Sequence, residues 1–263
     1  MTEVWKQTNL DDLMAAKLKL EYPGLTARVS ALMGKPIEAG LKLLPKNWNK
    51  KVGEITQAAL MKGLEFAIRT FGKKDERESN DLLHKALAFS SGTAGGAFGA
   101  LSATVELPIS TCIMLRSIAD IARSEGHDIT KLETRFACLE VFAIGGTSNR
   151  DDSTEEGYWA IRAALAKEIT EAIKHIAEKG MSKKGAPPLV RLITSIAARF
   201  SVVVTEEMAA KLVPAVGALS GGVVNLMFMN HFQEMARGHF VVKRLEKQYG
   251  SEAVRKKYIE IET

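Results

Sequence analysis

The chain has 263 residues, of which 46% are hydrophobic and 25% are charged, so it is long and apolar enough to fold around a core without disulfides or a metal. Its seven prolines and 21 glycines follow no period, which excludes a collagen-like or proline-rich chain. The net charge of +5 is modest and only 6% of the residues are aromatic. We therefore expect no nucleic-acid partner, because nucleic-acid binders carry denser basic stripes with aromatic side chains for base stacking.

Helical periodicity dominates the chain, and no run of alternating strand residues stands out. Pro108 suits the first turn of a helix, where its missing N–H is not needed, and Gly126 suits the end of that helix. In chain order, the sequence predicts helices over residues 10–21, 26–33, 36–44, 52–72, 81–105, 108–125, 130–143, 153–180, 190–200, 205–213 and 216–249. This pattern predicts an all-α protein.

The clearest of these helices covers residues 153–180. Ser153 and Glu156 have the spacing of a capping box, and Gly180 suits the left-handed position that ends a helix. Between them, apolar residues from Tyr158 onward recur every three to four positions, which is typical of an amphipathic surface helix.

The sequence predicts one domain over residues 1–263. The only linker-like stretch, near Gly185, is short and lies between apolar helices. Cys112 and Cys138 occur in apolar segments without metal-type spacing, so we expect them to be core residues. The first residues are acidic and lack an apolar signal region, which favours a cytoplasmic location.

Two glycine-rich segments, 86–105 and 212–230, contain no charged residue over about a membrane width. Gly92 and Gly96 in the first, and Gly217 and Gly221 in the second, have the spacing that lets two helix backbones approach closely. We expect a central glycine-rich helix pair wrapped by amphipathic helices. Reversible membrane association and a membrane span are the alternatives, and Asn225 argues against the span.

Metal and catalytic signals are weak. His231 and Glu234 share a helix face, but His239 projects about 80° away from His231, and three ligands on one helix do not enclose an ion. We therefore expect no metal and no cofactor, and we interpret these residues as capping and ion-pairing groups. Arg116 and Asp120, with Arg123, have the spacing of a salt-bridge row along one helix.

Asn225 and His239 fall on the apolar side of the helix predicted over 216–249, so both side chains should point inward and find a hydrogen bond. Glu106 and Asp120 are the favoured partners. Such a contact indicates either a core link that fixes helix register or a ligand pocket. The candidate polar site comprises Glu106, Arg116, Asp120, Asn225, His231, Glu234, Arg237 and His239.

The stretch "LKLLPKNWNKK" is the candidate membrane-facing segment. It places Lys46, Trp48, Lys50 and Lys51 close together, and Trp is favoured at a membrane interface while lysines are attracted to anionic lipid. We expect reversible binding to an anionic leaflet, the alternative being that these lysines are simply solvated.

Several long motifs resemble the EcsC protein family, bacterial proteins named for a companion of an ABC transporter operon. They include "ELPISTCIMLRSIADIARSEGHD", "RFACLEVFAIGG", "EEGYWAIRAALA" and "PAVGALSGGVVNLMFMNHFQEMARGHFVVKRLEKQYG", and the resemblance covers residues 17–250. It implies a helical fold, a biochemical activity that is not established, and a link to transport or the cell envelope. It implies no active-site residue.

Two functional hypotheses follow. The first is a non-enzymatic accessory protein, cytoplasmic or peripheral at the inner face of the plasma membrane, whose partner is an anionic membrane surface or a membrane transport protein. The alternative is a hydrolase or lipid-modifying enzyme that uses polar groups on the helix predicted over 216–249. Convergence of the candidate polar residues on one pocket favours the enzyme, and scatter favours the binding protein.

Overall fold

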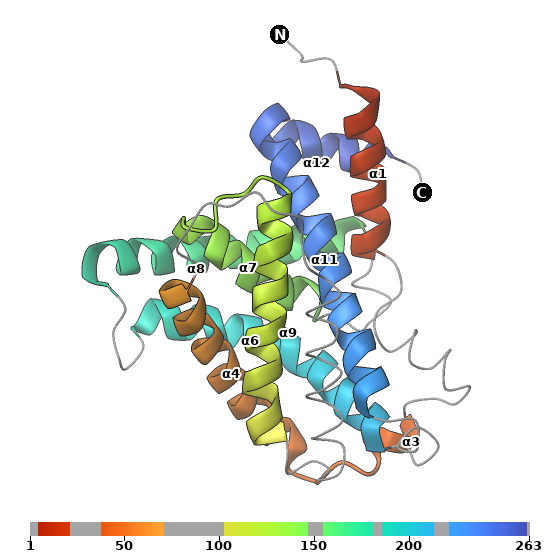
Figure 1. Cartoon of the computed structure of the whole chain (residues 1–263), viewed down its shortest axis with the longest axis vertical. Coiled ribbons are helices and arrows are strands. Elements are labelled where there is room, and N and C mark those ends of the chain that lie inside the picture. The colour runs from red at the N-terminus through yellow and green to blue at the C-terminus, as the bar shows by residue number, and fades with distance from the viewer. Residues whose placement is uncertain are drawn as a thin grey trace.

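The computed structural model describes residues 5–21, 38–70, 103–146, 155–180, 186–212 and 221–261. Every regular element in these ranges is an α-helix (Figure 1), which confirms the all-α prediction. The helices are α1 (Gln7–Glu21), α3 (Glu38–Leu41), α4 (Trp48–Thr70), α6 (Ala103–Ser124), α7 (Leu132–Ile144), α8 (Glu155–Lys179), α9 (Pro187–Leu212), α11 (Gly221–Tyr249) and α12 (Ser251–Glu260).

The core forms where α9 meets its neighbours, because α9 packs against α3, α4, α7, α8 and α11. Among the described helices, α9 is the one long and apolar enough to cross a membrane by length and composition. Here its apolar face lies against these helices, and the ring of Phe200 packs at a tilt against Phe142 and edge-on against Phe232. Cys138 is fully buried in α7, as predicted, and Cys112 is half-buried.

Several helix boundaries differ from the sequence prediction. Helix α6 begins at Ala103, so the prediction that Pro108 lies in its first turn is wrong, and α4 begins at Trp48 instead of residue 52. The predicted helices 190–200 and 205–213 form the single helix α9, because Val203 and Val204 are buried against neighbouring helices and favour continuing the turn between them. The sequence also missed α12. Gly250, with φ +86°, ends α11 in a conformation that suits glycine, and a further helix begins directly after it.

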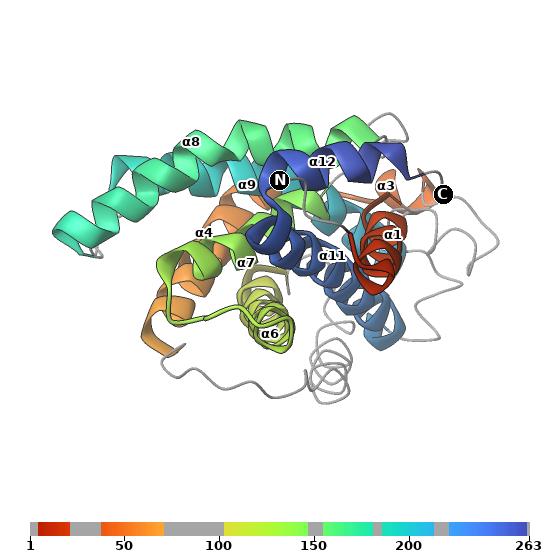
Figure 2. The ribbon, with the colours of Figure 1, turned by 90° about the horizontal axis from the view of Figure 1, so that it is seen from above.

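The two ends of the described chain lie together. The N-terminal helix α1 packs along α11 and also touches α12 (Figure 2). Asn9 Nδ2 donates a hydrogen bond of 2.7 Å to the Tyr249 hydroxyl, and Lys17 Nζ donates one of 2.6 Å to the carbonyl of Ile261. The ring of Trp5 stacks on that of Tyr249 at 4.1 Å.

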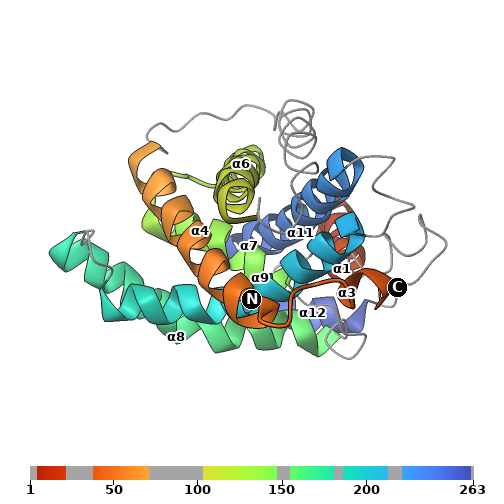
Figure 3. The same ribbon diagram turned by 90° about the horizontal axis from the view of Figure 1, so that it is seen from below.

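Helices α8 and α9 form a long neighbouring pair whose far end extends beyond the other helices (Figure 3). Arg191 of α9 pairs with Glu171 of α8 at 2.7 Å, and Ser195 donates a hydrogen bond to Glu168. The opposite end of α8 carries Trp159, which packs edge-on against Tyr258 of α12. Helix α8 therefore connects the core to α12.

The predicted central glycine-rich pair lies mostly outside the described residues, as do Gly96 and the helix predicted over 26–33. Close approach through glycine nevertheless occurs elsewhere. A methyl group on Gly238 of α11 would lie 2.7 Å from Leu20 and 2.9 Å from the carbonyl of Ala16 in α1. A methyl group on Gly146, just after α7, would lie 2.6 Å from the backbone of Arg199 in α9.

Candidate functional site

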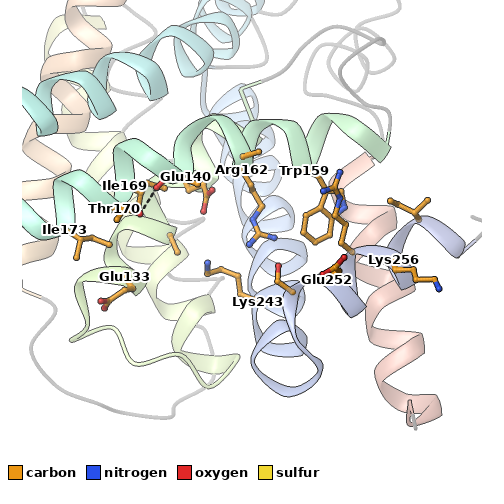
Figure 4. Close-up of a pocket in the computed structure, with 16 residues that line it drawn as sticks. Glu133, Glu140, Trp159, Arg162, Ile169, Thr170, Ile173, Lys243, Glu252 and Lys256 are labelled. Carbon is orange, nitrogen blue, oxygen red and sulfur yellow. Dashed lines mark hydrogen bonds between the residues drawn. The ribbon is translucent and has the colours of Figure 1, made fainter. Parts of the chain in front are cut away.

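A pocket of about 1020 Å³ lies between α7, α8, α11 and α12 (Figure 4). Each helix presents residues three, four or seven positions apart, which share one helix face. The lining residues are Glu133, Ala137 and Glu140 of α7; Trp159, Arg162, Ala163, Ala166, Ile169, Thr170 and Ile173 of α8; Lys243 of α11; and Ser251, Glu252, Arg255, Lys256 and Ile259 of α12.

Behind the wall of this pocket lies a row of buried side chains, of which Glu140 lines the pocket itself. The Tyr158 hydroxyl lies 3.0 Å from His239 Nδ1, and His239 Nε2 lies 3.4 Å from Glu140 Oε2. One tautomer fits both contacts: Tyr158 donates to Nδ1, and the proton on Nε2 faces the carboxylate. All three residues are almost fully buried.

Arg162 extends the row to the pocket surface. Its guanidinium donates two hydrogen bonds of 2.9 Å to the carboxylate of Glu246 and one of 3.3 Å to the Tyr158 hydroxyl. It also lies over the rings of Tyr158 and Trp159, at 5.3 and 5.0 Å from their centroids. The bidentate pair and the ring contacts fix the guanidinium in one orientation.

Burial sets the protonation states in this row. It raises the pKa of Tyr158 and lowers the pKa of His239 to about 4. Burial alone would raise the pKa of Glu140, but the contact with His239 and the nearby positive charges outweigh it, so that pKa falls. At neutral pH, Tyr158 is protonated, His239 neutral and Glu140 ionised. Glu140 is therefore the charged member of this row, and Tyr158 and His239 are its neutral members.

A second cavity, of about 840 Å³, adjoins the first and shares Glu133 and Lys243 with it. Its wall includes His127, whose Nε2 donates to the carbonyl of Phe240 at 3.0 Å and whose Nδ1 accepts from Lys247 at 2.8 Å. Burial lowers the pKa of His127 to about 4. The pKa of Lys247 is also lowered, first by burial and then by the charges of Lys131 and Lys243.

The sequence-predicted contact between Glu106 and Asn225 is confirmed. Asn225 Nδ2 donates a hydrogen bond of 3.3 Å to Glu106 Oε1, which also accepts one of 2.8 Å from Lys211. Lys211 pairs with Glu207 at 2.9 Å as well. The cavity among these groups is only about 10 Å³, so they form a core link between α6, α9 and α11 with no space for a ligand.

His239 points inward as predicted, but the prediction of Glu106 or Asp120 as its partner is wrong. Fourteen residues of continuous helix separate it from Asn225, which places it about 21 Å further along α11. At that position His239 contacts Tyr158 of α8 and Glu140 of α7.

The other candidate polar residues make separate local contacts. His231 Nε2 donates to the carbonyl of Gly145, which ends α7, at 2.7 Å. Asp120 pairs with both Arg116 and Arg123, as the salt-bridge row predicted. Glu234 and Arg237 are half-buried on α11. The contact of Asn225 with Glu106, the contact of His231 with Gly145 and the contacts of His239 thus lie at different places along α11. No cluster of metal-ligating side chains occurs among the described residues.

The membrane-facing prediction needs one correction. Trp48 is buried, and its indole Nε1 donates a hydrogen bond of 3.1 Å to Thr205 of α9, so it is a core residue and not an interfacial one. Lys46, Lys50 and Lys51 are exposed as expected. Beside them, the exposed fractions of Leu41 and Leu43 are 38% and 57%.

Sequence reasoning missed the pocket residues Glu140, Arg162 and Lys243, and it missed the contact that Tyr158 makes with His239 behind the pocket wall. One signal was available, because Glu140 is an acid within the otherwise apolar run "FACLEVFAIGG". A charge in such a run is buried and must have partners. The partners themselves lie on other helices.

Comparison with known proteins gives one family match. The model of the EcsC protein family matches residues 7–245. No curated protein and no solved structure matches the chain. The match covers nearly the same stretch as the motif resemblance found in the sequence.

Proposed function

The chain belongs to the EcsC protein family, and we propose that it is a non-enzymatic accessory protein that binds reversibly to an anionic membrane surface. Its place is the cytoplasm, at the inner face of the plasma membrane, where it assists a transport or envelope process. The observation that carries this proposal is the basic turn, which we define as Leu41, Lys42, Leu43, Lys46, Lys50 and Lys51.

The basic turn combines exposed leucines with exposed lysines between α3 and α4. Residues 39–53 include no acidic side chain, so the positive charge of this segment is uncompensated within it. Each lysine near an anionic leaflet contributes about 1 kcal/mol, so four supply about 4 kcal/mol. Insertion of Leu41 and Leu43 into the interface adds a hydrophobic contribution.

The scatter of the candidate polar residues supports a binding protein over the hydrolase or lipid-modifying alternative. Glu106 bonds to Lys211 and Asn225, whereas His239 lies about 21 Å further along α11 and contacts Tyr158 and Glu140. These two groups therefore do not meet at one reactive centre.

Sedimentation with vesicles tests the proposal. The protein should pellet with vesicles of mixed phosphatidylcholine and phosphatidylglycerol, less so at high salt, and not with phosphatidylcholine alone. The double variant Lys50→Glu with Lys51→Glu should bind at least about 30-fold more weakly, because two contributions of about 1 kcal/mol are lost. Leu43→Ser should weaken binding without changing its salt dependence.

The matched control is Lys167→Glu with Lys174→Glu, which makes the same charge change on the exposed side of α8. It should bind vesicles nearly as well as the unchanged protein. Equal sedimentation with neutral and anionic vesicles contradicts the proposal. So does an equal loss of binding in the two double variants.

A further inference from the structure

The pocket between α7, α8, α11 and α12 contains an apolar channel along α8. Ala163 and Ala166 are exposed there, and Ile169 and Ile173 are half-buried. The two alanines leave open space where larger side chains would fill it. From Ala163 to Ile173 the helix rises about 15 Å, which matches a single medium-length alkyl chain.

A cation projects into the same pocket without a direct ion pair. Lys243, half-buried on α11, reaches into the space beneath α8 (Figure 4), and it makes no hydrogen bond or ion pair with any side chain that the structure describes. Arg255 of α12 is likewise unpaired among the described residues. By contrast, Arg162 is neutralised by Glu246.

The acidic residues of the pocket offset this charge only in part. Glu133 and Glu252 are exposed at the rim, where water screens them. Glu140 is buried in the wall and faces His239 at 3.4 Å, and the charge of Lys243 helps to lower its pKa without a direct ion pair between the two. Lys256, the remaining cation, lies 3.9 Å from Glu260.

We propose that this pocket binds an anionic amphiphile, a single-chain lipid whose acidic headgroup pairs with Lys243 and Arg255 and whose alkyl chain lies along Ala163, Ala166, Ile169 and Ile173. The headgroup is a carboxylate or a phosphate, since both accept hydrogen bonds from lysine and arginine. A small polar anion leaves the channel empty, and a neutral amphiphile leaves Lys243 without a counterion.

Titration calorimetry below the micelle concentration tests the inference with decanoate, dodecanoate and dodecyl phosphate. Each added methylene should raise the affinity about fourfold, because each buries further apolar surface in the channel. Dodecanoate and dodecyl phosphate together identify which headgroup is preferred. Inorganic phosphate, which lacks the alkyl chain, should bind far more weakly than dodecyl phosphate. Dodecyl maltoside, which lacks the charge, should bind far more weakly than dodecanoate.

Two variants separate the headgroup from the chain. Lys243→Met should weaken dodecanoate binding by about tenfold or more, and Lys243→Arg should retain it. Ala166→Trp places a large side chain in the channel and should abolish the chain-length dependence. Its matched control, Ala164→Trp, makes the same change at an exposed α8 position outside the pocket and should leave binding unchanged.

Thermal unfolding of each variant separates loss of binding from loss of folding. The unfolding temperature of Ala164→Trp shows whether α8 accepts a tryptophan on its exposed side without loss of stability. Binding that does not depend on chain length overturns the proposal. So does equal binding of dodecyl maltoside and dodecanoate, or equal binding by the Ala166→Trp and Ala164→Trp variants. The inference does not rest on the basic turn: Lys243→Met should leave vesicle binding intact, and Leu43→Ser should leave dodecanoate binding intact.

Discussion

The hydroxyl of Tyr158 lies 3.0 Å from Nδ1 of His239, although 81 residues separate them in the chain. Tyr158 lies one turn into α8, and His239 lies in the middle of α11. Because both side chains are almost fully buried, neither can replace this partner with water.

Removing that hydroxyl should destabilise the protein. Tyr158→Phe leaves His239 Nδ1 without a donor in the core, which costs about 1–3 kcal/mol of unfolding free energy. The control is Tyr249→Phe, which loses a hydrogen bond from Asn9 at a half-buried position, where water substitutes. Urea unfolding of both variants measures the difference, and a Tyr249→Phe loss as large as that of Tyr158→Phe contradicts this account.

Stability should depend on pH through His127 and His239. Burial lowers the pKa of each to about 4, against about 6.5 in the unfolded chain. The unfolded chain binds more protons between these values, so the free energy of unfolding falls as the pH drops from about 6.5 to about 4. Each imidazole contributes a slope of at most about 1.4 kcal/mol per pH unit.

Urea unfolding at about pH 7, 6 and 5 tests this linkage. In His127→Asn, the decrease between pH 6 and 5 should be smaller than in the unchanged protein, because one of the two imidazoles is gone. A stability that stays constant or rises as the pH falls over this range shows that the imidazoles are not buried as described.

The ion pairs around Lys211 should be sensitive to removal of the lysine. Lys211→Met leaves the carboxylates of Glu106 and Glu207 without their cation in the core, which costs about 3–5 kcal/mol. Asn225→Ala removes the neutral hydrogen bond to Glu106 and leaves the lysine in place, so it should cost less, about 1 kcal/mol. Adding Glu207→Gln to Lys211→Met should recover part of the loss. Equal losses from the two single substitutions would contradict the buried pairing.

The glycines of α11 and α4 should respond to alanine in opposite directions. At Gly238 a methyl group overlaps Leu20 and the backbone of α1, so Gly238→Ala should lower stability by about 1–3 kcal/mol. At Gly53, inside α4, a methyl group meets nothing within 4 Å. Gly53→Ala should therefore raise stability by up to about 1 kcal/mol, the helix propensity difference. Thermal unfolding of the two variants provides the comparison, and a shift in the same direction for both would disprove it.

Helix phase explains which parts of this structure were predictable from sequence. Asn225 and His239 were expected to point inward because they share the apolar side of α11, and both do. The same argument, applied to α4, places Trp48 on one stripe with Val52 and Thr56, which are buried. The sequence prediction began this helix at residue 52, so Trp48 lay outside it and the lysines around Trp48 led to the interfacial prediction.

The pocket was not predictable in the same way. It depends on how α7, α8 and α12 cross, and a single sequence does not show which helices contact one another. Local patterns indicate that Glu140 needs a partner, but they do not indicate that the partner is His239. The contact of Glu106 with Asn225 was an easier case, because Asn225 falls on the apolar side of α11 and Glu106 was one of only two partners that the sequence offered for it. The additional contact of Glu106 with Lys211 was not predicted.

The packing of α1 on α11 has a consequence for how the protein is made on the ribosome. About 200 residues separate the end of α1 from the start of α11, so synthesis alone takes on the order of 10–40 s between them. During that interval Leu13 and Ala16 have no surface to cover them, because that surface belongs to a helix that does not yet exist. Docking of α1 is therefore a late event, after α11 has emerged, and a nascent chain stalled before residue 221 leaves its first helix exposed to chaperones and proteases.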